Sequence, residues 1–65
     1  MNNLFLDELS IVMQFCALVD QCKNLGSRGY SIEFCMETMK KFQEFLNNCI
    51  TDKELKQMIN DAVNS

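Results

Sequence analysis

The sequence contains no histidine, no proline and no tryptophan, and only two of its 65 residues are glycine. Without histidine the chain lacks the commonest metal ligand, and it lacks the base of serine–histidine and cysteine–histidine nucleophile pairs. We therefore expect a protein that is not an enzyme and that takes no cofactor, no metal and no small-molecule substrate. The absence of proline and the scarcity of glycine favour helices, because these two residues have the lowest helix propensities.

Positive charge and long apolar runs are also scarce. Nine acidic residues outnumber six basic ones, which leaves a net charge of -3, whereas phosphate binding needs an excess of cations. The longest uncharged run, Leu9 to Val19, is 11 residues long, well short of the roughly 20 that a membrane span needs. No basic segment precedes the first apolar residues, as it would in a secretory signal. We expect a cytoplasmic protein that binds neither membranes nor, in the main interpretation, nucleic acid.

Apolar residues are plentiful and make up 48% of the chain. This proportion is enough for the chain to fold, but 65 residues are too few to build a large core. Domains of this size bury only about 60% of their unfolded surface and often gain stability by association. The Pro-free composition with many Asn and Lys residues is also compatible with a phage or bacterial origin. We expect one domain, 1–65, that associates with a protein partner or with itself.

Both glycines fall in the segment 25–31, which predicts the main turn. Gly26 suits the left-handed position after a helix, and Ser31 suits the N-cap of the next one. The predicted helices cover 4–25 and 32–49.

A second break carries the pattern of a capping box, in which Thr51 caps the amide of Glu54 and the Glu54 carboxylate returns to Thr51. A third helix is predicted from about Asp52, with an apolar stripe at Leu55, Met58, Ile59, Ala62 and Val63. The predicted fold is all-α, a small three-helix bundle built on an antiparallel helical hairpin with a short third helix.

The second predicted helix carries an apolar seam with heptad spacing, at Ile32, Cys35, Met39, Phe42, Leu46 and Cys49. Truncating Phe42 or Leu46 to alanine is predicted to cost about 2 to 5 kcal/mol each. The opposite side of this helix is predicted to face water, and it holds Glu33, Glu37, Lys40, Lys41, Glu44, Asn47 and Asn48.

The first predicted helix is apolar around most of its circumference, more than two single-striped helices can cover. A patch left uncovered predicts a protein-binding surface. The residues expected to bind the partner are Val12, Phe15, Val19, Phe34 and Phe45, with Arg28 and Tyr30 at the rim of the interface.

The four cysteines, Cys16, Cys22, Cys35 and Cys49, form no C-x-x-C pair, so we expect reduced thiols packed as small apolar residues. Folding the first two helices back on each other brings Cys22 and Cys35 to similar heights, and the sequence leaves a disulfide between them open.

These features predict a non-catalytic helical module for protein–protein interaction, a homodimer or a small regulator, inhibitor or chaperone-like subunit. The alternative is a regulator of the helix-turn-helix type that binds nucleic acid through its third helix. The side chains that would read the bases are Lys53, Lys56, Gln57 and Asn60.

Overall fold

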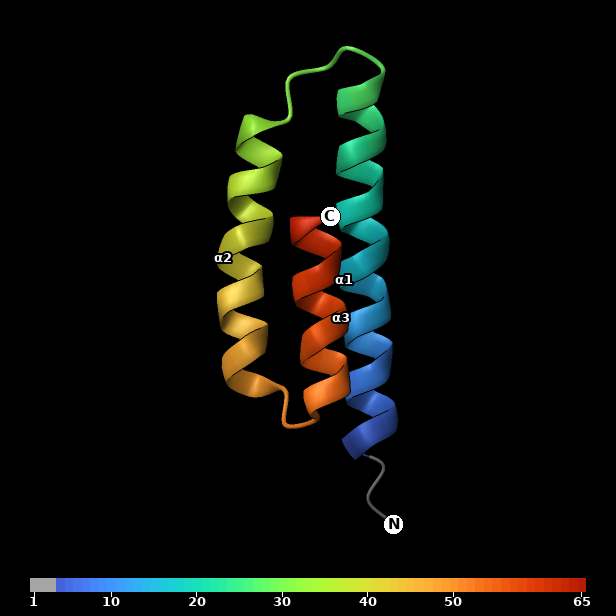
Figure 1. Cartoon of the computed structure of the whole chain (residues 1–65), viewed down its shortest axis with the longest axis vertical. Helices are drawn as coiled ribbons and strands as arrows, with labels where there is room; N and C mark the ends of the chain where they lie inside the picture. Colours follow the sequence, from blue (N-terminus) through green and yellow to red (C-terminus); the bar gives the residue numbers. More distant parts are fainter. Residues whose placement is uncertain (1–3) are drawn as a thin grey trace.

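The computed structural model describes residues 4–65, and the side chains of residues 7–65. Three helices follow one another, α1 (Leu4–Ser27), α2 (Glu33–Cys49) and α3 (Lys53–Asn64). Figure 1 shows α2 running antiparallel to both α1 and α3. The predicted all-α three-helix bundle is confirmed.

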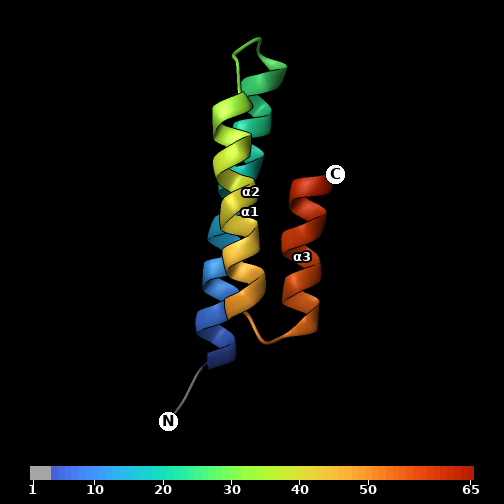
Figure 2. The ribbon, with the colours of Figure 1, turned by 90° about the vertical axis from the view of Figure 1, so that its left-hand side faces the viewer.

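Helix α3 lies on one side of the pair formed by α1 and α2 (Figure 2). It packs against α1 and against α2 more extensively than these two helices pack against each other. The third helix is therefore the element that joins the other two, although it is the shortest. All three helices and the second connection supply the core, which comprises Val12, Phe15, Val19, Met39, Leu46, Ile50, Leu55, Ile59 and Val63.

Helix α1 ends at a different glycine from the one predicted. Gly29, and not Gly26, takes the left-handed conformation, with φ +95°. The Tyr30 amide donates to the Leu25 carbonyl at 3.1 Å and the Gly29 amide to the Gly26 carbonyl at 3.0 Å, which is the Schellman pattern. Gly26 stays helical and serves for close packing, because a Cβ there would lie 2.8 Å from Cδ1 of Ile32.

The caps of the other two helices also differ from the prediction. Ile32 precedes α2 and makes no side-chain cap, so Ser31 does not fill that role. Asp52 caps α3 by accepting a hydrogen bond from the Leu55 amide at 3.0 Å. Thr51 instead donates its amide (3.2 Å) and its hydroxyl (3.1 Å) to the carboxylate of Glu8 on α1. The predicted capping box is therefore wrong, because the Glu8 carboxylate accepts hydrogen bonds from both donors of Thr51.

The seam predicted on α2 is correct only in part. Met39 and Leu46 are buried, whereas Phe42 and Cys49 are exposed. The reason is that α2 turns the side bearing Gln43 and Asn47 toward α3. The loss of about 2 to 5 kcal/mol on truncation stays a prediction for the buried Leu46. We expect a smaller loss for Phe42, because half of that residue is already in solvent.

A small cluster of side-chain amides joins α2 to α3. Gln43 and Asn47 donate to the same acceptor, Oδ1 of Asn60, at 2.9 Å and 3.0 Å. Asn47 was predicted to face water, yet its own Oδ1 is buried without a hydrogen-bond partner in the described structure. The side-chain oxygen of Asn60 therefore works as an acceptor inside the bundle.

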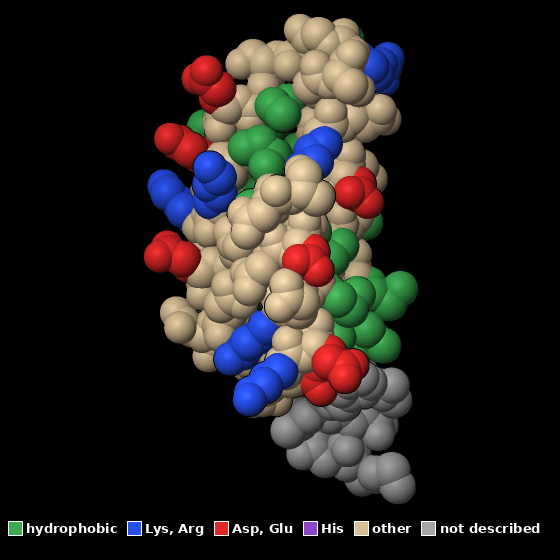
Figure 3. Space-filling view, viewed as in Figure 1, with side chains coloured by type: hydrophobic (Ala, Val, Ile, Leu, Met, Phe, Trp, Pro, Cys, Tyr) green, Lys and Arg blue, Asp and Glu red, His purple; other side chains and the backbone are tan. Residues whose placement is uncertain are grey.

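The surface around α3 is largely polar, with acidic and basic side chains interspersed (Figure 3). Helices α2 and α3 run alongside each other in both ribbon views (Figures 1 and 2). A helix-turn-helix motif instead needs two helices that cross at a wide angle.

Among the described residues, no helix combines the length and apolarity that crossing a membrane requires.

Candidate functional site

Three of the residues predicted to bind a partner lie in the core. Val12 and Val19 are fully buried and Phe15 almost so. They face inward because α3 packs along this part of α1, a region that the sequence pattern had left to a partner. The prediction that they form an exposed patch is wrong.

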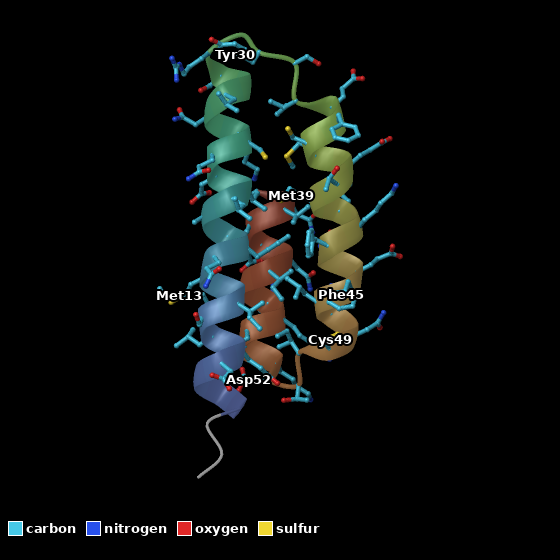
Figure 4. The ribbon with its side chains drawn as sticks, turned by 180° about the vertical axis from the view of Figure 1, so that it is seen from behind. Met13, Tyr30, Met39, Phe45, Cys49 and Asp52 are labelled. Atoms are coloured by element: carbon cyan, nitrogen blue, oxygen red, sulfur yellow. The ribbon has the colours of Figure 1, made fainter. Side chains whose placement is uncertain are left out.

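An apolar groove remains between α1 and α2 on the side away from α3. It has a volume of about 190 Å³, and its lining is almost entirely apolar, with Ile11, Gln14, Phe15 and Leu18 from α1 and Phe42 and Leu46 from α2. Ile11, Leu18 and Phe42 are each about half exposed. Figure 4 looks onto this side of the molecule, with Phe45 on α2 and Met13 directed away from α2 on the outer side of α1.

The groove exists because α1 and α2 have limited direct contact with each other. Phe15 and Leu46 form its buried floor, where both side chains also belong to the core. Ile11 and Leu18 are seven residues apart and therefore lie on one line along α1, next to Phe15. An apolar side chain from outside would meet apolar walls on both helices and a closed floor.

A ridge of exposed aromatic residues on α2, which we call the Phe34–Phe45 ridge, borders the groove. Phe34 is 81% exposed and Phe45 60% exposed, and the two are 11 residues apart, close to three full turns. Between them a shallower hollow is lined by Thr38, Lys41, Phe42 and Phe45. The Thr38 hydroxyl donates its hydrogen to the Phe34 carbonyl at 3.0 Å.

Arg28 and Tyr30, predicted at the rim of the interface, lie in the connection between α1 and α2 and are exposed. The Arg28 guanidinium is 6.0 Å from the centre of the Tyr30 ring, at the limit for a cation–π contact. Tyr30 lies at the loop end of the bundle, away from Phe45 (Figure 4). The structure therefore does not bring these two residues to the groove.

The four cysteines are free thiols. Burial raises the pKa of the Cys22 thiol, and the neighbouring thiol of Cys35 raises it further. Burial and then the charge of Asp20 raise the pKa of Cys16, so neither residue has the lowered pKa of a reactive cysteine. In the part of the chain whose side chains are described, no three Cys, Asp or Glu residues gather as a metal site would require.

Sequence reasoning missed Ile11, Leu18 and Phe42 as groove residues. A signal for the first two was available, because Ile11, Leu18 and Leu25 follow one another at intervals of seven on α1. This is the spacing of a helix that packs lengthwise against another helix. Phe42 was placed in the core by the heptad pattern of α2, and only the position of α3 shows that it lies at the edge.

Comparisons of this chain with protein-family models, with curated proteins and with solved structures give no match. The site therefore stands on its own geometry.

Proposed function

We propose that this protein is a non-catalytic module for protein–protein interaction, and that the groove between α1 and α2 is its binding face for a helical segment of protein. The observation that carries the proposal is the apolar lining of the groove, with Ile11, Leu18 and Phe42 each about half exposed. Isolated apolar residues on a surface need no explanation, whereas apolar residues that line one concave face on two helices are typical of a binding groove.

The shape of the groove supports a helical ligand. Two antiparallel helices with a furrow between them leave room for a further helix, which packs against both as a neighbouring helix of a bundle does. The third helix cannot fill this furrow, because it already lies on the opposite side (Figure 2). The four free thiols also support the cytoplasmic location predicted from the sequence, since disulfides are rare in that compartment.

Site-specific photo-crosslinking tests the proposal. The photoreactive amino acid benzoylphenylalanine replaces Phe45 at the edge of the groove in one variant. In the control it replaces Met13, which is equally apolar and 57% exposed but lies on the outer side of α1. Both variants are illuminated as purified protein and in a lysate of the native cells, and the adducts are identified by mass spectrometry.

We expect a discrete protein adduct from position 45 and none from position 13. The adduct can be a second copy of the chain or another protein, since either is a protein bound at the groove. No adduct from position 45, or the same adducts from both positions, would overturn the proposal.

A further inference from the structure

The face between α1 and α2 carries both a hollow and groups that fit it. The groove volume of about 190 Å³ slightly exceeds the roughly 150 Å³ of an apolar cavity that accepts one benzene molecule. Phe45 is exposed and lines the hollow next to the groove. Phe34 is also exposed and lies on the same line of α2, because 11 residues are close to three full turns. A surface that presents a phenyl-sized hollow next to projecting phenyl rings is complementary to itself, as a two-fold symmetric interface requires.

The apolar area on this face matches what a stable dimer needs. At exposures of 81%, 48% and 60%, Phe34, Phe42 and Phe45 together leave about 400 Å² in solvent, taking about 200 Å² for a phenylalanine. An interface of standard size buries about 800 Å² on each copy, and about 65% of a homodimer interface is apolar. The three rings supply most of that apolar area, and Ile11 and Leu18 supply much of the rest.

The charges on this face allow two copies to meet. The residues that line the groove and the adjoining hollow include one charged side chain, that of Lys41. At 100° per residue, the acidic residues of α2, Glu33, Glu37 and Glu44, fall on the side of that helix opposite Phe42, and Glu37 lies about 60° from Phe34. The lining of the face therefore brings no two carboxylates together, and Asp7 lies beyond the groove, one turn before Ile11 on the same side of α1.

We propose that the occupant of the groove is a second copy of this chain. The two copies meet face to face about a two-fold axis, so that α1 and α2 of both form a four-helix core with α3 outside on each copy. One aromatic ring of each Phe34–Phe45 ridge enters the hollow of the other copy. This inference rests on the proposed function, because it names the partner for the same groove.

Sedimentation equilibrium over a range from low to high micromolar concentration tests the dimer. The weight-average mass of the parent chain is expected to rise from 7.5 kDa to twice that value. Phe45→Glu places an unpaired charge in the interface and is expected to weaken the dimer roughly 100-fold or more. Met13→Glu, at the exposed position on the outer side of α1, is expected to leave the equilibrium unchanged.

Because both positions are exposed, we expect circular dichroism to show that both variants remain folded. Phe34→Glu, at the most exposed ring, is expected to weaken the dimer as well. A parent chain that stays at 7.5 kDa throughout would overturn the dimer, as would equal weakening by Phe45→Glu and Met13→Glu. If the parent chain is monomeric and the photo-crosslinker at position 45 captures a different protein, the dimer is wrong and the proposed function stands. If the parent chain is monomeric and that crosslinker captures nothing, the dimer and the proposed function are both wrong.

Discussion

At the scale of single residues, Gly29 is the position where the backbone conformation most disfavours any residue with a side chain. Its φ of +95° is a conformation that costs a residue with a side chain about 1 to 2 kcal/mol. No atom lies within 4 Å of a Cβ built there, so Gly29→Ala tests the backbone conformation alone. We expect the free energy of unfolding, measured by urea denaturation, to fall by about 1 kcal/mol.

Gly29→Asn is the matched variant, because asparagine tolerates positive φ better than alanine does, and it is expected to lose less stability. Gly26→Ala has a different balance, since the helical position favours alanine by about 1 kcal/mol while Ile32 must move to admit the methyl group. A Gly29→Ala protein as stable as the parent would show that the turn does not hold the left-handed conformation in solution.

Cys16 links local burial to a dependence on pH. Burial raises the pKa of its thiol above the usual 9.0, and the nearby charge of Asp20 raises it further. Only the thiolate reacts with iodoacetamide, so at about pH 8 we expect slower alkylation of Cys16 than of a cysteine in an unfolded peptide. Peptide mapping by mass spectrometry gives the rate for each cysteine.

The same shift has a consequence for stability. The folded state prefers the protonated thiol of Cys16. The contribution of this preference to the free energy of unfolding is therefore fully present below pH 9, and it is lost as the pH rises through the raised pKa. The free energy of unfolding should therefore decline above pH 9 less steeply in Cys16→Ala than in the parent chain. Alkylation of Cys16 at the unfolded-peptide rate would contradict the burial seen here.

At the scale of whole elements, a single lysine on α1 completes the end of α3. The ammonium group of Lys23 donates to the carbonyl oxygens of Ala62 and Ser65, both at 2.6 Å, and to the Ser65 hydroxyl at 3.0 Å. A cation at this place satisfies carbonyls that the helix leaves unpaired and complements the helix dipole. It also ties the last turn of α3 to α1.

Lys23→Met keeps most of the apolar stem and removes the charge. We expect it to lower the free energy of unfolding by about 1 kcal/mol and to speed amide hydrogen exchange in the last turn of α3. Lys40→Met, on the exposed side of α2, is the control and should change neither. Equal exchange in the two variants would show that Lys23 does not hold the end of α3.

The helices themselves could be predicted from the sequence, because apolar spacing and the lack of proline specify them locally. Their caps could not, since Gly26 and Gly29 both suit a turn locally. The choice depends on Ile32 packing where Gly26 lacks a side chain. For the same reason Thr51 was predicted as a cap, although a glutamate 43 residues away accepts both of its hydrogen bonds.

The site was predicted only in outline. An excess of apolar surface on α1 was visible in the sequence, and Phe34 and Phe45 are exposed as predicted. A helix that is apolar nearly all round gives no local sign of which part its neighbours cover. The position of α3 decides this, because it buries Val12 and Val19 and leaves Ile11 and Leu18 at the groove.

At the scale of the whole molecule, α3 stabilises the arrangement of the other two helices. Leu55, Ile59 and Val63 of α3 are buried in the same core as Val12 and Val19 of α1. Because α1 and α2 contact each other less than either contacts α3, the pair loses most of its shared core without it. We therefore expect that the hairpin of the first two helices does not fold independently.

A chain truncated to residues 1–52 tests this dependence. Removal of α3 exposes the fully buried Val12 and Val19, and each apolar side chain brought into water costs about 1.5 to 3 kcal/mol, a large share of the 5 to 15 kcal/mol by which domains are stable. We expect the fragment to lose cooperative thermal unfolding by circular dichroism at low micromolar concentration. Addition of a peptide covering 52–65 should restore part of the helical signal, whereas the same peptide with Ile59→Asp should not, because Ile59 is fully buried. A cooperative transition in the fragment alone would mean that α1 and α2 share enough buried surface to fold by themselves.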